Sequence, residues 1–253
     1  MSYSPFFNDL MISAGFVAGY EAVVITGFNG DIDTGAMEDI WNQGGTLAWL
    51  SSAETMDLVS DDANDTSAGT GLQSVLVEGV DADYNEISEV VVMNGLTDVT
   101  TTSSFFYVKR LTGLGVGSNG KNIGNITATA STAATVQAKI DAGDGISKNG
   151  FYIVPAGKTL FSNSIIFTAG KISGGGGSPN LTIATEINPL GTSCTLQGPF
   201  DLDTSVTNEF IIPNGVSEAI PEKTRIRFCA ATDVNNAFLG VGANAVLIDN
   251  TLL

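Results

Sequence analysis

Residues 81–86 carry oxygen-bearing side chains at alternate positions, and oxygen atoms are the ligands that Ca²⁺ prefers. An EF-hand loop that began at Asp81 would need glycine in place of Glu86 and glutamate in place of Val92. Neither is present. The other interpretation is a solvated hairpin tip, in which Asp and Asn side chains bond their own backbone. The hairpin tip is favoured, and no metal ligand is predicted.

A second acidic stretch raises the same question. It contains Asp61, Asp62, Asn64 and Asp65, within a polar loop at 61–71. Asp and Asn are frequent in such loops because their side chains accept hydrogen bonds from nearby backbone N–H groups. A calcium site and a solvated loop are again the two alternatives, and the loop is preferred.

The residue types that most often carry catalysis are missing or isolated. The sequence has no histidine, which excludes the Ser-His-Asp and Cys-His arrangements and imidazole-ligated zinc. The glycines at 113–120 and 174–177 lack a following βα unit and predict no phosphate-binding loop. Paired carboxylates would suffice for glycoside hydrolysis, but 27 acidic residues single out no pair. No catalytic or cofactor-binding residue is predicted, and we expect a protein that is not an enzyme.

Aromatic side chains offer a carbohydrate-binding face as another option. The candidates are Tyr84, Trp41, Trp49 and the run at 105–107. Within a strand, Phe105 and Tyr107 would face one side and Phe106 the other. We favour the interpretation that these residues belong to a packed core.

The two cysteines, Cys194 and Cys229, lie far apart in the sequence. Cys229 falls in a strand-like run at 225–230, and free cysteine is among the most buried residue types. A disulfide is the alternative, since pairing depends on a Cα separation that a sequence does not give. A buried free thiol is the preferred interpretation.

Composition indicates an ordered, acidic chain. The 253 residues are 43% hydrophobic, whereas disorder combines low hydrophobicity with high net charge. A net charge of -17 argues against nucleic acid and anionic membranes as partners, because cationic side chains bind both. The uncharged run at 10–20 is too short to span a membrane, and no basic signal segment precedes it. We therefore expect a soluble protein that is made without export.

Short strands dominate the predicted structure. Segments with the apolar–polar alternation of half-buried strands occur at 56–60, 72–78, 86–93 and 104–110. Turn residues at 81–85 and the dipeptide Asn94–Gly95 join the last three, which predicts a β-meander. In the second half, strands separated by turns are expected at 151–154, 159–168, 181–187, 194–196, 209–212, 224–231 and 238–249.

The first 48 residues are less regular. Residues 16–28 predict one or two strands, and 31–41 is the best helical candidate, with Asp33 or Thr34 as its N-cap. The predicted fold class is all-β: an antiparallel β-sandwich or jelly roll, as one or two stacked sandwich domains with an N-terminal arm. The predicted division is 1–48 for the arm and lead-in, 49–141 for the first sandwich and 151–253 for the second.

Loop and strand motifs along the chain carry a resemblance to a known group of proteins. The segments are LVSDDANDTSAGTG at 58–71, VDADYNEISE at 80–89, and shorter pieces at 30–34, 94–95, 99–102, 117–120 and 154–159, with Trp41. They resemble virion structural proteins of tailed bacteriophages from marine and aquatic sources. The resemblance implies a particle component, includes no catalytic signature, and transfers no functional residue.

Together these features predict a non-enzymatic virion protein without a cofactor: a capsid decoration, cement or head-spike protein. An apolar arm at 2–8, with Phe6 and Phe7, would dock on the shell. The expected partners are the major capsid protein or other virion proteins and further copies of the chain, with a trimer as the expected oligomer. The alternative is a tail or head fibre or connector component that binds a receptor or a glycan. The chain would be made in the host cytoplasm and assembled on the virion.

Overall fold

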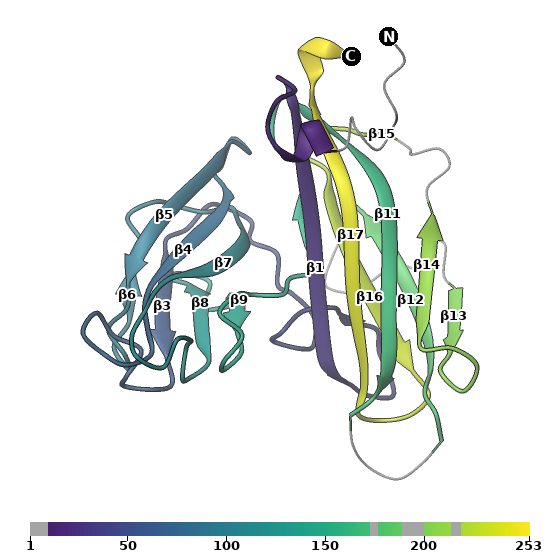
Figure 1. Ribbon diagram of the computed structural model, residues 1–253, viewed down its shortest axis with the longest axis horizontal. Coiled ribbons are helices and arrows are strands. Elements are labelled where there is room, and N and C mark those ends of the chain that lie inside the picture. Colours follow the sequence, from purple (N-terminus) through teal and green to yellow (C-terminus); the bar gives the residue numbers. More distant parts are fainter. Residues whose placement is uncertain (1–9, 173–176, 189–199, 214–218) are drawn as a thin grey trace.

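The computed structural model describes residues 10–172, 177–188, 200–213 and 219–253. These residues form two lobes of β-strands that lie side by side (Figure 1). Every pairing between the named strands is antiparallel, apart from isolated bridges. The predicted all-β, antiparallel class is therefore confirmed.

The first lobe consists of two sheets that share one core. Its strands are β3 (Met56–Ser60), β4 (Leu72–Val80), β5 (Glu86–Val92), β6 (Val99–Thr100), β7 (Tyr107–Val116), β8 (Ile126–Ala130) and β9 (Val136–Ile140). One sheet has the order β6-β3-β8-β9 and the other β5-β4-β7. Side chains of both sheets meet in a single buried cluster that includes Leu58, Val75 and Ile126.

The second lobe takes strands from both ends of the chain. They are β1 (Tyr20–Ile32), β2 (Glu38–Asp39), β10 (Phe151–Ile153), β11 (Lys158–Lys171), β12 (Asn180–Ile187), β13 (Phe200–Asp203), β14 (Glu209–Pro213), β15 (Ala219–Ile220), β16 (Arg225–Thr232) and β17 (Ala237–Asp249), followed by a 3₁₀ turn η1 (Asn250–Leu252). One sheet has the order β1-β17-β11-β14, with β15 beside β11. The other has the order β10-β16-β12-β13, with β2 beside β16. Their inner faces share a second core.

Alternation in β1 shows why this sequence forms a strand. Val23 and Ile25 point into the core, whereas Val24 and Thr26 point outward, which is the period-two pattern of a half-buried strand. Most of the strands expected in the second half are confirmed as β10, β11, β12, β14, β16 and β17. The expected strand at 194–196 lies outside the described residues.

The predicted β-meander is wrong in its strand order. The turn at 81–85 does join β4 to β5, but β7 pairs with β4 rather than with β5. After β5 the chain crosses to the other sheet, where β6 pairs with β3. Asn94 and Gly95 serve this crossing, since Asn94 forms a bridge with Thr66 and Gly95 N–H donates to the Asp65 carbonyl (2.8 Å). Turn chemistry was recognisable in the sequence, but the choice of partner strand was not.

The predicted helix at 31–41 is also wrong. Residues up to Ile32 continue β1, and β2 pairs with β16. Glu38 accepts hydrogen bonds from the Asp33 backbone N–H (3.2 Å) and the Asn29 side chain (3.1 Å), so the chain folds back on β1. Tertiary pairing thus overrides a weak local preference for helix.

The segment predicted as a lead-in is part of the second lobe. β1 pairs with β17 along most of its length, and β2 lies at the edge of the facing sheet. The chain then enters the first lobe after Leu50 and returns to the second lobe at β10. The first lobe is therefore inserted between strands of the second (Figure 1).

A third buried cluster joins the two lobes. Its fully buried members are Trp41, Leu47, Val80, Tyr107, Phe151 and Ile153. The Phe151 ring lies 5.4 Å from that of Trp41 and 5.8 Å from that of Trp49, measured between ring centroids. The Tyr107 hydroxyl, from the first lobe, donates to the Phe151 carbonyl of the second (2.7 Å). We call this cluster the aromatic junction.

Replacing Phe151 with alanine tests how much the aromatic junction contributes to stability. We expect the free energy of unfolding to fall by about 3–5 kcal/mol, because a buried ring is lost and its cavity remains. Phe16→Ala is the matched control, since Phe16 is 73% exposed, and it should change stability by less than about 0.5 kcal/mol. Urea unfolding measures both, and equal effects would contradict the assigned role.

Candidate interaction surface

Asp65 organises the loops at one end of the first lobe. Its carboxylate is fully buried and accepts hydrogen bonds from Ser60 Oγ (2.7 Å) and from the backbone N–H groups of Leu72 (2.7 Å), Ile123 (3.0 Å) and Gly124 (2.9 Å). Each carboxylate oxygen therefore has at least two protein donors, and the Ile123 N–H is shared between them. Gly71 is required beside it, because a Cβ at this position would lie 2.1 Å from Asp65 Oδ1.

The neighbouring acidic residues are engaged in the same way. Asp62 Oδ1 accepts from the Asn64 backbone N–H (2.8 Å), and both Asp61 oxygens accept from Asn125. Among the residues that the structure describes, no group of three or more His, Cys, Asp or Glu side chains is placed to hold a metal ion. The second acidic stretch thus forms an internally bonded loop.

Asp81 likewise closes its own turn. Its Oδ1 accepts from the backbone N–H groups of Asp83 (2.8 Å) and Asn85 (2.9 Å). Slight burial raises the pKa of the Asp81 carboxyl, but the bonds from Asn85 and Asp83 outweigh it, so the pKa lies below its ordinary value. This is the hairpin-tip arrangement favoured from the sequence.

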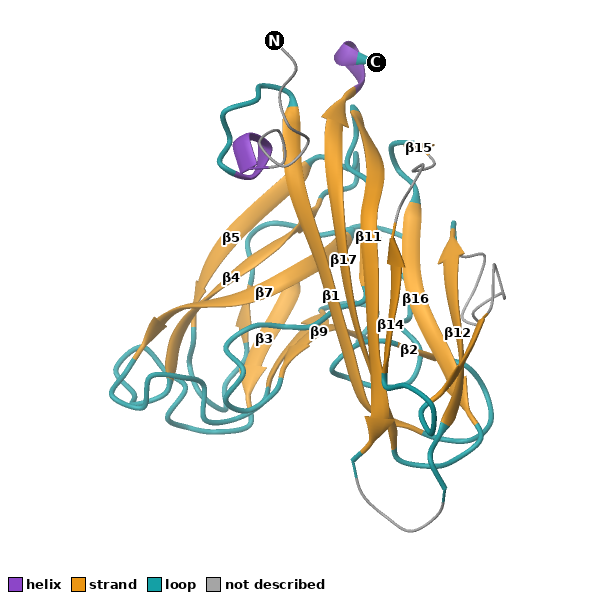
Figure 2. Ribbon diagram, turned by 45° about the vertical axis from the view of Figure 1, so that its right-hand side comes forward, coloured by secondary structure: helices purple, strands orange, loops and turns teal. Residues whose placement is uncertain are grey.

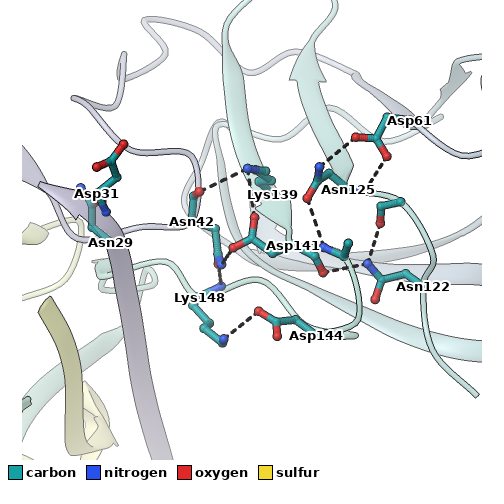
Figure 3. A network of polar contacts seen from close by, with 12 residues as sticks. Asn29, Asp31, Asn42, Asp61, Asn122, Asn125, Lys139, Asp141, Asp144 and Lys148 are labelled. Carbon is teal, nitrogen blue, oxygen red and sulfur yellow. Dashed lines mark hydrogen bonds and ion pairs between the residues drawn. The ribbon is translucent and has the colours of Figure 1, made fainter. Parts of the chain in front are cut away.

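A polar network connects the loops of the first lobe to the segment after β2 (Figure 3). Asn42 donates to Asp141 Oδ2 (2.6 Å) and accepts from the Lys148 backbone N–H. Asp141 also pairs with Lys139 (3.0 Å), and Lys148 pairs with Asp144 (2.7 Å). All of these partners are amides or opposite charges, so the network holds the loops in place.

The aromatic candidates for a carbohydrate face lie in the protein interior or at the junction. Phe105 is in the core of the first lobe, and Trp41 and Tyr107 belong to the aromatic junction. Tyr84 and Trp49, like Phe106, are partly buried against the junction. The core interpretation accounts for their positions.

The preference for a free thiol at Cys229 is wrong. Cys229 is fully buried and disulfide-bonded, and no described cysteine is free. The other cysteine of the sequence, Cys194, lies outside the described residues. Burial was predicted correctly, but the bond depends on a distance that residue type does not encode.

A buried ionic cluster beside Cys229 was missed from the sequence. Arg227 Nε lies 2.6 Å from Glu186 Oε2, and Arg227 NH1 lies 3.7 Å from Asp39 Oδ1, with all three side chains at most 2% exposed. Asp39 Oδ2 also accepts from the Leu47 backbone N–H (2.7 Å). The available signal was the position of Arg227 between Ile226 and Phe228 in strand β16.

Burial dominates the titration of Asp39. It raises the pKa of this carboxyl to about 6, although the Arg227 charge and the Leu47 N–H act in the opposite direction. The cluster is therefore a set of buried charges in the second lobe. Removing any one of them would leave another buried charge without its partner, which is strongly destabilising.

One broad surface of the second lobe is uncharged. It is the outward face of β1, β17 and β11, which lie side by side, with β1 closest to the first lobe (Figure 2). In register across the three strands, the outward rows are Ala22/Val246/Phe161, Val24/Asn244/Ser164, Thr26/Gly242/Ile166 and Phe28/Gly240/Thr168. These rows hold no charged side chain, and we call them the uncharged face.

Charged groups border this face at two places. Glu209 of β14 is paired with Thr168, and Lys148 Nζ lies 5.3 Å from the centre of the Phe28 ring. Lys109 and Arg110 of the first lobe line a recess together with Val24 and Thr26 at the β1 edge. Val24 is 56% exposed, and Ile211 on β14 extends the apolar surface at 50% exposure. In a chain with a net charge of -17, an uncharged and partly apolar sheet face is a candidate contact area for another protein.

The predicted docking residues Phe6 and Phe7 lie outside the described residues. The described chain begins at Leu10 with a helical turn at 10–13. Ile12 and Ser13 of this turn border a cavity of about 200 Å³ together with Val24 and Val246. The predicted arm is therefore connected to the chain at one end of the uncharged face. Among the described residues, no helix is long and apolar enough to cross a membrane.

Comparison with known proteins gives little. The sequence matches no protein-family model and no curated protein. A structure of infectious bursal disease virus, Gt strain, is 10% identical and covers 99% of this chain and 79% of its own, with a TM-score of 0.17. A mutant VP2 protein of the same virus, from derived T=1 particles, is 13% identical over 98% of this chain and 76% of its own, with a TM-score of 0.15. Scores this low carry no argument about fold or function.

Asp65→Asn tests the loop assignment. An asparagine replaces one acceptor oxygen with an NH₂ group that faces backbone donors, and we expect a loss of about 3 kcal/mol in the free energy of unfolding. Asp62→Asn keeps an acceptor for the Asn64 N–H and should cost less than about 0.5 kcal/mol. Thermal unfolding with calcium and with a chelator should give the same midpoint; a calcium-dependent midpoint would favour a metal site instead.

Asp39 gives a pH dependence with a definite sign. Its pKa rises from an unfolded value near about 4 to about 6 on folding, so folding favours the protonated form. This group therefore lowers the free energy of unfolding by about 3 kcal/mol as the pH rises from about 4 to about 6, and is without further effect above that. Subtracting the pH–stability curve of Asp39→Asn from that of the wild type should isolate this slope. A flat difference would exclude it.

Proposed function

We propose that this chain is a non-enzymatic structural protein of a tailed phage virion, acting as a decoration, cement or head-spike protein on the capsid. The uncharged face carries this proposal. Many copies of a decoration protein must contact the shell, and like-charge repulsion would oppose this contact unless the contact surface is uncharged. The acidic surface that remains exposed keeps free copies of the chain soluble. The outward rows of β1, β17 and β11 meet that requirement.

The rest of the fold supports a mechanical role. The two lobes share the aromatic junction and the Asn42 network, so contact forces on one lobe pass to the other through buried and bonded groups. The motifs that resemble phage virion proteins include the Asp65 loop and the Asp81 turn, which position strands. The absence of histidine from the sequence supports a role without catalysis.

The partners follow from the same surface. The major capsid protein or another virion protein would cover the uncharged face, and the arm with Phe6 and Phe7 would add an apolar contact at its end. Further copies of the chain would complete a homo-oligomer, with closed cyclic symmetry as the usual outcome.

Val24→Asp tests the surface directly. A carboxylate on the β1 strand of the uncharged face would be buried on docking, and the neighbouring Lys109 and Arg110 are already paired with Glu86 and Glu78. Binding to particles that lack this chain should therefore weaken at least about tenfold. Val206→Asp is the matched control, because Val206 is 81% exposed in the turn after β13 and outside the uncharged face. Co-sedimentation with particles measures both variants, and equal binding of Val24→Asp and wild type would reject this surface.

Cryo-electron microscopy of the intact particle tests the location. We expect density for this chain to repeat over the shell, with the uncharged face toward the capsid. Density confined to one vertex or to the tail would reject decoration and support the fibre or connector alternative. Deleting residues 2–8 distinguishes the contribution of the arm from that of the uncharged face. Unchanged particle binding by that variant would show that Phe6 and Phe7 do not contribute to the contact.

A further inference from the structure

A small recess lies where the two lobes meet. It is beside the edge of β1 that does not pair with β17. Its cavity of about 20 Å³ is lined by Val24, Ile25 and Thr26 of β1, by Lys109 and Arg110 of β7, and by Ser147, Asn149, Phe151 and Tyr152. The recess thus has walls from both lobes.

Two buried polar side chains border the recess without a hydrogen-bond partner among the described residues. Both amide atoms of Asn149 and the hydroxyl of Tyr152 are in this state, at 4% and 2% exposure of the whole residues. Buried polar groups are nearly always bonded in folded proteins, because an unbonded one loses its hydration without replacement. An amide with neither atom bonded is the stronger departure from that rule.

The groups around the recess define what it would bind. Asn149 presents both a donor and an acceptor. Burial, with Glu86 and Glu21 nearby, raises the pKa of the Tyr152 hydroxyl, so it keeps its proton and donates. The cations are already compensated, since Lys109 lies 3.4 Å from Glu86 and Arg110 lies 2.9 Å from Glu78. A neutral ligand that both donates and accepts fits these groups better than an ion does.

We propose that the recess is a binding site for one structural water molecule, held by Asn149 and Tyr152. A cavity of this size accommodates a single water, and such a water needs two to four polar partners. It accepts from the Tyr152 hydroxyl and donates to Asn149 Oδ1. Because residues of β1 and of β7 both line the recess, the water also lies at the contact between the lobes.

The sign of a stability change tests this site. With the water bound, Tyr152→Phe removes a satisfied hydroxyl and should increase the unfolding equilibrium constant about fivefold to tenfold. With a dry recess, the same change removes an unbonded hydroxyl and should stabilise the protein. Tyr107→Phe is the control, since the Tyr107 hydroxyl donates to the Phe151 carbonyl and its loss must destabilise.

A crystal structure at a resolution that shows ordered water gives the second test. We expect a peak within hydrogen-bond distance of Asn149 and Tyr152, absent or displaced in Asn149→Leu. A stabilising Tyr152→Phe together with no peak would overturn the proposal. So would an anomalous peak at this position in crystals grown with bromide, which would make the recess an anion site.

Discussion

Close packing of aromatic rings between the lobes is the interaction on which the rest of the structure depends. Phe151 begins the return of the chain to the second lobe and contacts both tryptophans, while Tyr107 comes from β7 of the first. Arg225 adds its guanidinium over the Trp49 ring (5.2 Å) and over the Phe106 ring (5.0 Å). Two sandwiches joined by a short linker would move independently, whereas a shared buried cluster fixes their relation.

Charge is distributed in a way that complements this packing. Most of the few cationic side chains form ion pairs within the chain, such as Arg227 with Glu186 and Arg110 with Glu78. The carboxylates lie in both strands and loops, and in the loops Asp65 and Asp81 accept hydrogen bonds from backbone N–H groups. The uncharged face is the part of the second lobe from which charged residues are absent. Its β-branched, aromatic and glycine residues are compatible with paired strands and carry no charge.

Local features were predictable from the sequence, and pairings between distant segments were not. The turn at 81–85 was found because Asp and Asn chemistry is local, and the prediction of one or two strands at 16–28 corresponds to β1. The order β5-β4-β7 was missed because either neighbour of β4 satisfies the same alternation. The choice between a calcium site and a hydrogen-bonded loop at 61–71 depends on where the Asp65 oxygens point. The same neighbouring residues in the sequence are compatible with a bound cation or with the four hydrogen-bond donors that the structure shows. Cys229 illustrates the same limit, because its burial was predicted and its disulfide bond was not. The buried pair of Arg227 with Glu186 was not predicted at all.

The insertion of one lobe between strands of the other has a consequence for how the chain reaches its native state. Thr34 and Asn235, which are hydrogen-bonded, lie 201 residues apart, and β17 occupies the interior of its sheet although it is the last strand. During synthesis the first lobe has all its strands before β11 and β17 emerge. Until β17 has been synthesised, β1 lacks its pairing partner and exposes apolar side chains. An unpaired apolar strand of this kind favours aggregation and slow folding. The net charge of -17 supplies a repulsion that keeps such incompletely folded chains apart.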